Sequence, residues 1–87
     1  KDNFTKIRVL HSLANLARFQ GITADEVRFR ESLVDLKPTG LEWFALAGAR
    51  ERIGDFSGAR SAYQKAVKLG GLTPAAARQA KERAARS

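Results

Sequence analysis

Few side chains in this sequence could catalyse a reaction or bind a metal ion. The chain has 87 residues, one histidine (His11) and no cysteine, which excludes a thiol nucleophile, a disulfide framework and a cysteine zinc site. No group of histidine and carboxylate residues accompanies His11, and helix capping or solvation explains the acidic pairs Asp25/Glu26 and Glu51/Asp55. We therefore expect no catalytic residue, no metal site and no cofactor, and we expect that the protein is not an enzyme.

The chain is strongly basic, with a formal net charge of +7. Residues 1–39 contain 7 basic and 5 acidic residues, residues 40–73 contain 5 and 3, and residues 74–87 contain 4 and 1. The positive charge is therefore spread along the chain and is densest in the last segment. This balance permits an acidic protein or a nucleic acid as partner, although a solvated, arginine-rich surface is the simpler explanation.

The periodicity of apolar residues predicts five helices and no strand, near residues 4–20, 24–36, 40–53, 57–69 and 74–86. Their short connections make consecutive helices antiparallel, so the expected fold class is all-α, a stack of helical hairpins. No apolar run approaches the ~18 residues of a membrane-spanning helix, so we expect no membrane insertion. Because the chain opens on Lys1 rather than methionine, we also expect it to be part of a longer protein.

Signals at the helix ends support these boundaries. Gly21, Gly54 and Gly70-Gly71 are typical of helix C-termini, and Pro38 ends the second helix. No G-x-x-x-x-G-K-[ST] pattern surrounds the glycines, so they do not predict a phosphate-binding loop. The expected N-terminal caps are T-x-x-E boxes at Thr23 and Thr39, and Thr73 followed by proline.

Residues 40–73 carry aromatic and small residues at regular spacing. The members of this set are Trp43, Leu46 and Ala47, then Gly54, Asp55 and Phe56 at a turn, then Ala59, Tyr63, Ala66 and Leu69. The set resembles the tetratricopeptide repeat, a helix-turn-helix of roughly 34 residues with the pattern W-x2-L-G-x2-Y, then A-x3-F, then P. The segment departs from that pattern at Ala47, Arg50 and Gly71, where glycine, tyrosine and proline are usual.

Two further parts of the chain resemble the same family. Residues 7–39 match as a degenerate repeat, in which Glu26 stands at the position of Ala59 and Arg30 at that of Tyr63. Residues 74–87 match the first helix of a third repeat, and we expect them to form a capping helix with Lys81 in water. The resemblance implies one domain over residues 1–87, a segment of a right-handed superhelix.

The resemblance also implies how the hairpins pack. Ala47 and Ala59 should meet where two helix backbones approach closely. A glutamate would not fit such a contact, so we expect a splayed first hairpin or an outward-pointing Glu26, with Phe19 and Phe29 supplying aromatic bulk. The structural positions are Trp43, Leu46, Ala47, Gly54, Phe56, Ala59, Tyr63 and Ala66. All of these except Ala47 and Gly54 are expected to be mostly buried.

Members of this family commonly bind an extended peptide or a partner helix along a concave wall formed by the first helix of each repeat. The resemblance therefore implies a protein-protein interaction module. Its groove positions, carried over by register, are Arg8, His11, Asn15 and Arg18 in the first helix, Phe44, Gly48, Glu51 and Arg52 in the third, and Arg78, Glu82 and Arg86 in the fifth.

The groove residues also suggest a class of partner. Some family members hold a peptide's terminal carboxylate with a lysine and an asparagine one helical turn apart, and His11 and Asn15 occupy those two positions. The arginines beside them predict an acidic or carboxylate-bearing peptide, whereas the plainer interpretation is an ordinary polar helix face. The alternative function is a basic nucleic-acid-binding domain, but no aromatic residues for base stacking are interleaved with its candidates, Arg78, Lys81, Arg83 and Arg86.

The first helix raises the question of self-association. It exposes whichever of Phe4, Ile7 and Val9 it does not bury. We therefore expect a partner surface on the N-terminal side, covered either by earlier repeats of a parent protein or by a second copy of this chain.

Overall fold

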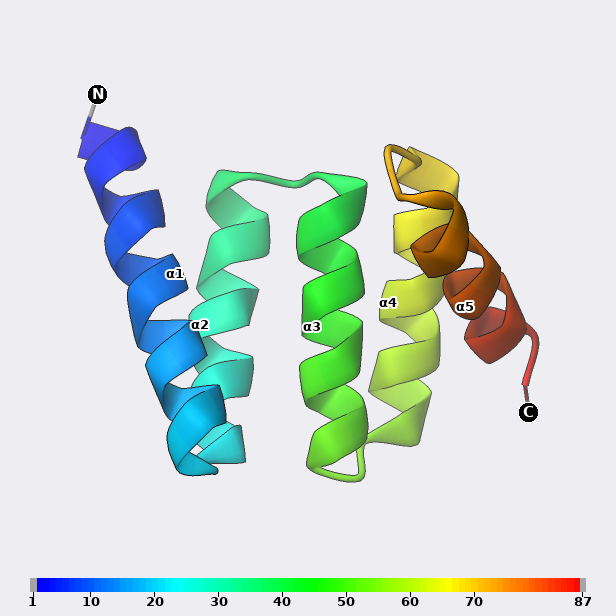
Figure 1. The fold of residues 1–87 in the computed structure, drawn as a ribbon, viewed down its shortest axis with the longest axis horizontal. Coiled ribbons are helices and arrows are strands. Elements are labelled where there is room, and N and C mark those ends of the chain that lie inside the picture. The colour runs from blue at the N-terminus through cyan, green and yellow to red at the C-terminus, as the bar shows by residue number, and fades with distance from the viewer. Residues whose placement is uncertain (1, 87) are drawn as a thin grey trace.

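The computed structural model describes residues 2–86, with side chains from residue 3. These residues form five helices and no strand: α1 (Asp2–Gln20), α2 (Thr23–Leu36), α3 (Gly40–Arg52), α4 (Phe56–Leu69) and α5 (Pro74–Ala85). Successive helices run antiparallel across the molecule, with α1 in front of α2 and α5 in front of α4 (Figure 1). The predicted all-α stack of helical hairpins is confirmed, and no helix within residues 2–86 has the length and hydropathy needed to cross a membrane.

Two of the three predicted N-terminal caps are confirmed. The Thr39 hydroxyl accepts a hydrogen bond from the Glu42 amide at 3.3 Å, and the Thr73 hydroxyl accepts one from the Ala76 amide at 3.2 Å. The predicted box at Thr23 is wrong, because α2 begins after Ile22 and no side chain caps it. The carboxylate that would complete that box is Glu26, and ion pairs in the interior hold it instead.

The core consists largely of alanines and a few larger side chains. Ala47 of α3 and Ala59 of α4 are both buried in one cluster with Tyr63. Leu46 and Ala66 are also fully buried, as predicted. On the outer side of α4, Ala80 of α5 completes this cluster, and Lys81 is exposed as expected.

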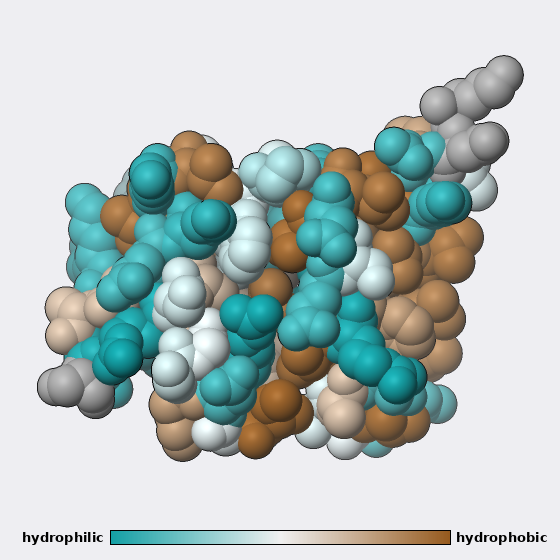
Figure 2. Space-filling model, turned by 180° about the vertical axis from the view of Figure 1, so that it is seen from behind, coloured by the Kyte–Doolittle hydropathy of each residue, from teal (hydrophilic) through white to brown (hydrophobic). Residues whose placement is uncertain are grey.

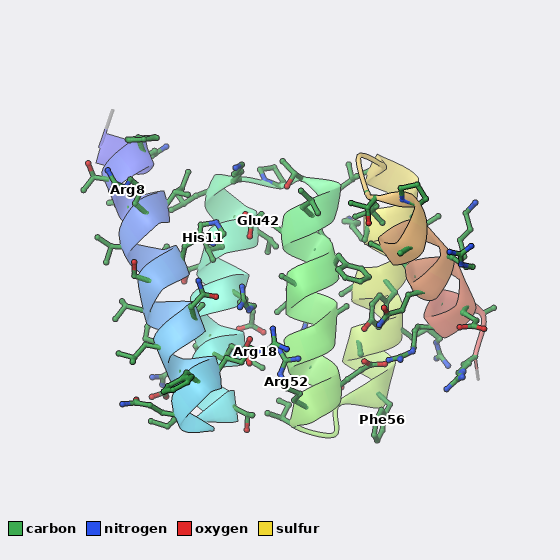
Figure 3. The ribbon with its side chains drawn as sticks, viewed as in Figure 1. Arg8, His11, Arg18, Glu42, Arg52 and Phe56 are labelled. Carbon is green, nitrogen blue, oxygen red and sulfur yellow. The ribbon has the colours of Figure 1, made fainter. Side chains whose placement is uncertain are left out.

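Two predictions about aromatic residues are wrong. Phe56 is 69% exposed, because it is the first residue of α4 and its side chain projects past the helix end, away from the other helices (Figure 3). Phe19 is 89% exposed near the end of α1 and supplies no bulk to the first hairpin, whereas Phe29 is half-buried. Trp43, expected to be mostly buried, is half-buried and packs against both core clusters.

Gly40 makes a close approach that the sequence analysis did not identify. It is the first residue of α3 and is buried. A Cβ atom at this position would collide with the Gly70 carbonyl oxygen and would lie 3.1 Å from the Ala66 carbonyl oxygen. The absence of a side chain therefore lets the start of α3 contact the end of α4.

Candidate binding pocket

All five helices contribute to one hollow of about 210 Å³, which we call the arginine pocket. Its lining residues are Arg18 from α1, Arg30 from α2, Phe44, Ala45, Gly48, Glu51 and Arg52 from α3, Tyr63 from α4 and Gln79 from α5. Arg18 and Arg52 lie in the interval between α1 and α3 (Figure 3). The pocket therefore lies where the stacked hairpins meet, and its shape depends on the whole fold.

The structure brings five of the predicted groove residues to this pocket and leaves the others elsewhere. Arg18, Phe44, Gly48, Glu51 and Arg52 all line it. The remaining predicted residues on α1 and α5 do not. Arg8 lies over the Phe4 ring, Arg78 and Glu82 are exposed on α5, Arg86 lines a different hollow beside Phe56, and His11 and Asn15 are bonded within the protein.

Glu26 lies behind the pocket and has no exposed surface. Its Oε2 atom accepts hydrogen bonds from Arg30 Nε at 2.8 Å and from Arg52 Nη2 at 2.7 Å, and its Oε1 atom accepts one from Arg52 Nε at 3.2 Å. The expectation of an outward-pointing Glu26 is wrong, because two guanidinium groups neutralise the carboxylate where it is buried. The alternative expectation, a splayed first hairpin, stays a prediction. A buried charge needs such partners, since desolvation without them costs several kcal/mol.

The same contacts set the protonation of Glu26. Burial raises the pKa of this carboxyl group, but the hydrogen bonds and charges of Arg52 and Arg30 together outweigh burial and lower the pKa below its ordinary value. Glu26 is therefore ionised at neutral pH and fixes the position of both arginine side chains.

His11 and Asn15 both contact residues of other helices, although Asn15 is exposed and 39% of the His11 side chain is accessible. The Nε2 atom of His11 lies 2.9 Å from the Oε2 atom of Glu42, whose side chain is nearly buried, and this contact joins α1 to α3 (Figure 3). Arg30 Nη2 donates to the Asn15 Oδ1 atom at 3.3 Å. The two positions at which the family resemblance places a carboxylate clamp are thus engaged in contacts inside the protein.

Glu51 forms the boundary of the pocket towards α5. Its Oε2 atom lies 2.6 Å from Arg83 Nη1, and its Oε1 atom accepts a hydrogen bond from the Tyr63 hydroxyl at 2.9 Å. Burial, followed by the hydrogen bond and charge of Glu51, raises the pKa of Tyr63 to about 12. The hydrogen bond with Glu51 likewise raises the pKa of Arg83. This network ties α5 to α3 and satisfies the charge of Glu51.

The arginine pocket keeps an excess of positive charge after these pairs are counted. Arg18, Arg30, Arg52 and Glu51 line it. Glu51 pairs with Arg83 outside the pocket, and Glu26 behind the pocket pairs with Arg30 and Arg52, so these four arginines and two carboxylates leave two positive charges uncompensated. Among the described residues Arg18 has no ion-pair partner, and no hydrogen bond uses Arg52 Nη1. Arg52 Nη1 lies 3.5 Å from where a Cβ atom of Gly48 would be, so this glycine leaves room for the guanidinium.

Arg30, Gln79 and the role of Glu26 are absent from the groove predicted from the sequence. Glu26 and Arg30 are four residues apart, which places them on one helix face and was a usable signal for an ion pair. The contact between Glu26 and Arg52 joins residues 26 positions apart, and nothing in either helix indicates it. The family resemblance gave no indication of the Glu26–Arg30 ion pair in α2, because the repeat pattern treats positions 26 and 30 only as departures from it.

Comparison with protein-family models and with curated proteins found no significant match to this chain.

Proposed function

We propose that this protein is a protein-protein interaction module of the tetratricopeptide-repeat type, which binds an acidic peptide or partner helix across α1, α3 and α5. The observation that carries the proposal is the arginine pocket, a hollow of about 210 Å³ with side chains from every helix and two uncompensated positive charges. Such a site attracts an acidic segment at long range and orients it at short range.

The aromatic and amide groups of the pocket support a peptide ligand. Phe44 packs edge-to-face on Tyr63 with ring centroids 5.7 Å apart, so a rigid apolar wall lies beside the arginines. Gln79 adds an amide that can both donate to and accept from a peptide backbone. This mixture of a few charged groups with aromatic surface is typical of interfaces.

The nucleic-acid alternative has less support from the charge distribution. Of its four candidate residues on or after α5, Arg83 is committed to Glu51. The pocket aromatics Phe44 and Tyr63 are half-buried and buried, so neither offers the open ring face on which a base stacks.

A peptide array tests the proposal. Matched acidic, neutral and basic peptides are presented to the chain, and we expect retention of acidic peptides only. Single-stranded RNA and DNA are titrated in parallel at several salt concentrations. Equal retention of acidic and basic peptides would contradict the proposal, and tight RNA or DNA binding with a steep salt dependence would favour the alternative.

A further inference from the structure

We propose that the arginine pocket binds one oxyanion of the partner between Arg18 and Arg52, and that it binds the phosphate of a phosphorylated side chain more tightly than a carboxylate. The inference rests on the proposed function in that the partner peptide supplies the anion. It concerns residues other than His11 and Asn15, whose side chains contact Glu42 and Arg30.

The donors for this anion are already oriented. Arg52 uses Nε and Nη2 on Glu26, which leaves Nη1 above Gly48 on the pocket side. Arg30 is nearly buried and uses Nε on Glu26 and Nη2 on Asn15. Because these side chains are fixed before a ligand arrives, binding does not have to restrict them, which favours affinity.

Arg18 supplies the mobile half of the site. It is exposed and, among the described residues, forms no ion pair, so its guanidinium can close on an anion that reaches the pocket. Guanidinium groups form paired hydrogen bonds with carboxylates and phosphates alike. The approach from α1 would complete the coordination that Arg52 begins from α3.

The charge balance favours phosphate over carboxylate. The pocket has two uncompensated positive charges, and a phosphate monoester carries about −1.5 to −2 at neutral pH whereas a carboxylate carries a single charge. A phosphate therefore neutralises the site more fully. It also offers three terminal oxygens as acceptors for donors that arrive from two helices.

The test uses small probes at constant ionic strength: N-acetyl-O-phosphoserine amide, N-acetylglutamate amide, N-acetylserine amide and inorganic phosphate. Binding is followed by NMR through the Gly48 amide signal and the Arg52 Nε–H signal. We expect saturable shifts that are largest and tightest for the phosphoserine probe, weaker for glutamate and absent for serine. Inorganic phosphate should compete with the phosphoserine probe.

Arg18→Gln is the decisive variant, because Arg18 holds no other side chain and its loss should not disturb the fold. We expect phosphoserine binding to weaken roughly tenfold or more, as for the loss of one charge-assisted hydrogen bond. Lys68→Gln removes the same charge from an exposed site on α4 outside the pocket and should leave binding unchanged. Equal weakening in both variants, absence of saturation, or glutamate binding at least as tight as phosphoserine would overturn the inference.

Its failure is distinguishable from failure of the proposed function. If acidic peptides bind the chain but the probes do not reach the pocket, the oxyanion site is refuted and the interaction module stands. If the probes bind as expected but no peptide on the array does, the site stands and the proposed function is refuted.

Discussion

A single side chain, Glu26, connects the first hairpin to α3 through buried ion pairs. The repeat pattern that the chain resembles has a small residue at this position, and the sequence predicts that a glutamate there separates the helices or turns outward. Instead the carboxylate is buried completely and two arginines from different helices donate to it. Glu26 and Arg30 both depart from the repeat pattern, and their opposite charges compensate each other. A pattern that scores each position separately cannot reveal such a pair.

Replacement of Glu26 tests this arrangement. Glu26→Gln leaves two guanidinium groups close together without a counter-charge, and we expect the free energy of unfolding to fall by about 3 kcal/mol or more. Asp25→Asn is the matched control, because Asp25 pairs with Arg28 at the surface, where such pairs contribute about 0–1 kcal/mol. Chemical denaturation measures both, and similar losses in the two variants would show that Glu26 is not the stabilising member.

The lowered pKa of Glu26 also predicts how stability depends on pH. The ionised form is favoured in the folded state, so this stabilisation is fully present above the ordinary pKa of the unfolded chain and is lost as pH falls through the folded-state value. We expect the acid limb of the stability profile to be shallower in Glu26→Gln than in the unchanged protein. An identical acid limb in both proteins would contradict the assignment.

Tyr63 gives a second test at this scale, because it is the only tyrosine in the chain. Its pKa is raised to about 12, so folding favours the neutral phenol. The resulting stabilisation is fully present below the ordinary pKa of tyrosine and is lost as pH rises towards the pKa of the folded state. We expect the ultraviolet absorbance of tyrosinate to appear at a pH about two units higher than in a denatured chain. Glu51→Gln should bring that transition closer to the ordinary value, and an unshifted titration of the native protein would exclude the buried hydrogen bond.

At the scale of helices, the sequence predicted most of the architecture. All five helices end within two residues of their predicted bounds, because glycine, proline and threonine act locally at the termini. The wrong predictions at Phe56 and Thr23 concern contacts between helices. At Thr23, the Glu26 carboxylate that would complete a capping box forms ion pairs with Arg30 and Arg52 instead. Likewise Gly40 has helical geometry, and only the position of α4 shows why a side chain is excluded there.

The threonine caps can be compared directly. Thr39→Ala removes a hydrogen bond to a free amide at the start of α3 and should lower the free energy of unfolding by about 0.5–2 kcal/mol. Thr23→Ala changes the same residue type at a helix start where no side-chain cap forms, so a smaller loss is expected. Thermal denaturation measures the loss of stability in both variants. A larger loss for Thr23→Ala than for Thr39→Ala would support a capping box at Thr23 after all.

Gly40 and Gly48 form another matched pair on α3. Gly40→Ala forces a methyl group against the carbonyl oxygens of Gly70 and Ala66, which cannot move without displacing the end of α4, and a loss of about 1–3 kcal/mol or more follows. Gly48→Ala meets only the flexible end of Arg52 at an ordinary contact distance. It should be tolerated in the fold. Equal stability of the two variants would show that α3 and α4 are not in close contact at this end.

At the scale of the whole molecule, α1 carries an apolar face on which two copies of this chain, each with a net charge of +7, could meet. Exposed Val9, Leu13 and Leu16 lie on α1 beside a hollow of about 520 Å³ between α1 and the end of α2. Figure 2 shows hydrophobic residues gathered along this edge of the molecule. The charged residues that line the hollow, Lys6 and Asp35, have opposite signs, so the hollow itself has no excess of charge. Arg8 lines a neighbouring hollow with Val9 and Leu13.

We therefore expect a second copy, rather than another partner, to cover this face when the chain is studied alone. A two-fold arrangement would place the leucine ridge of each copy in the hollow of the other, as an isologous interface requires. Sedimentation velocity over a range of concentrations should show a monomer–dimer equilibrium that Leu16→Glu abolishes. Leu69→Glu is the matched control, because Leu69 on α4 is 50% exposed and Leu16 is 51% exposed, yet Leu69 lies away from α1. A concentration-independent monomer, or equal disruption by both variants, would refute an α1 interface and leave the exposed leucines without a role in self-association.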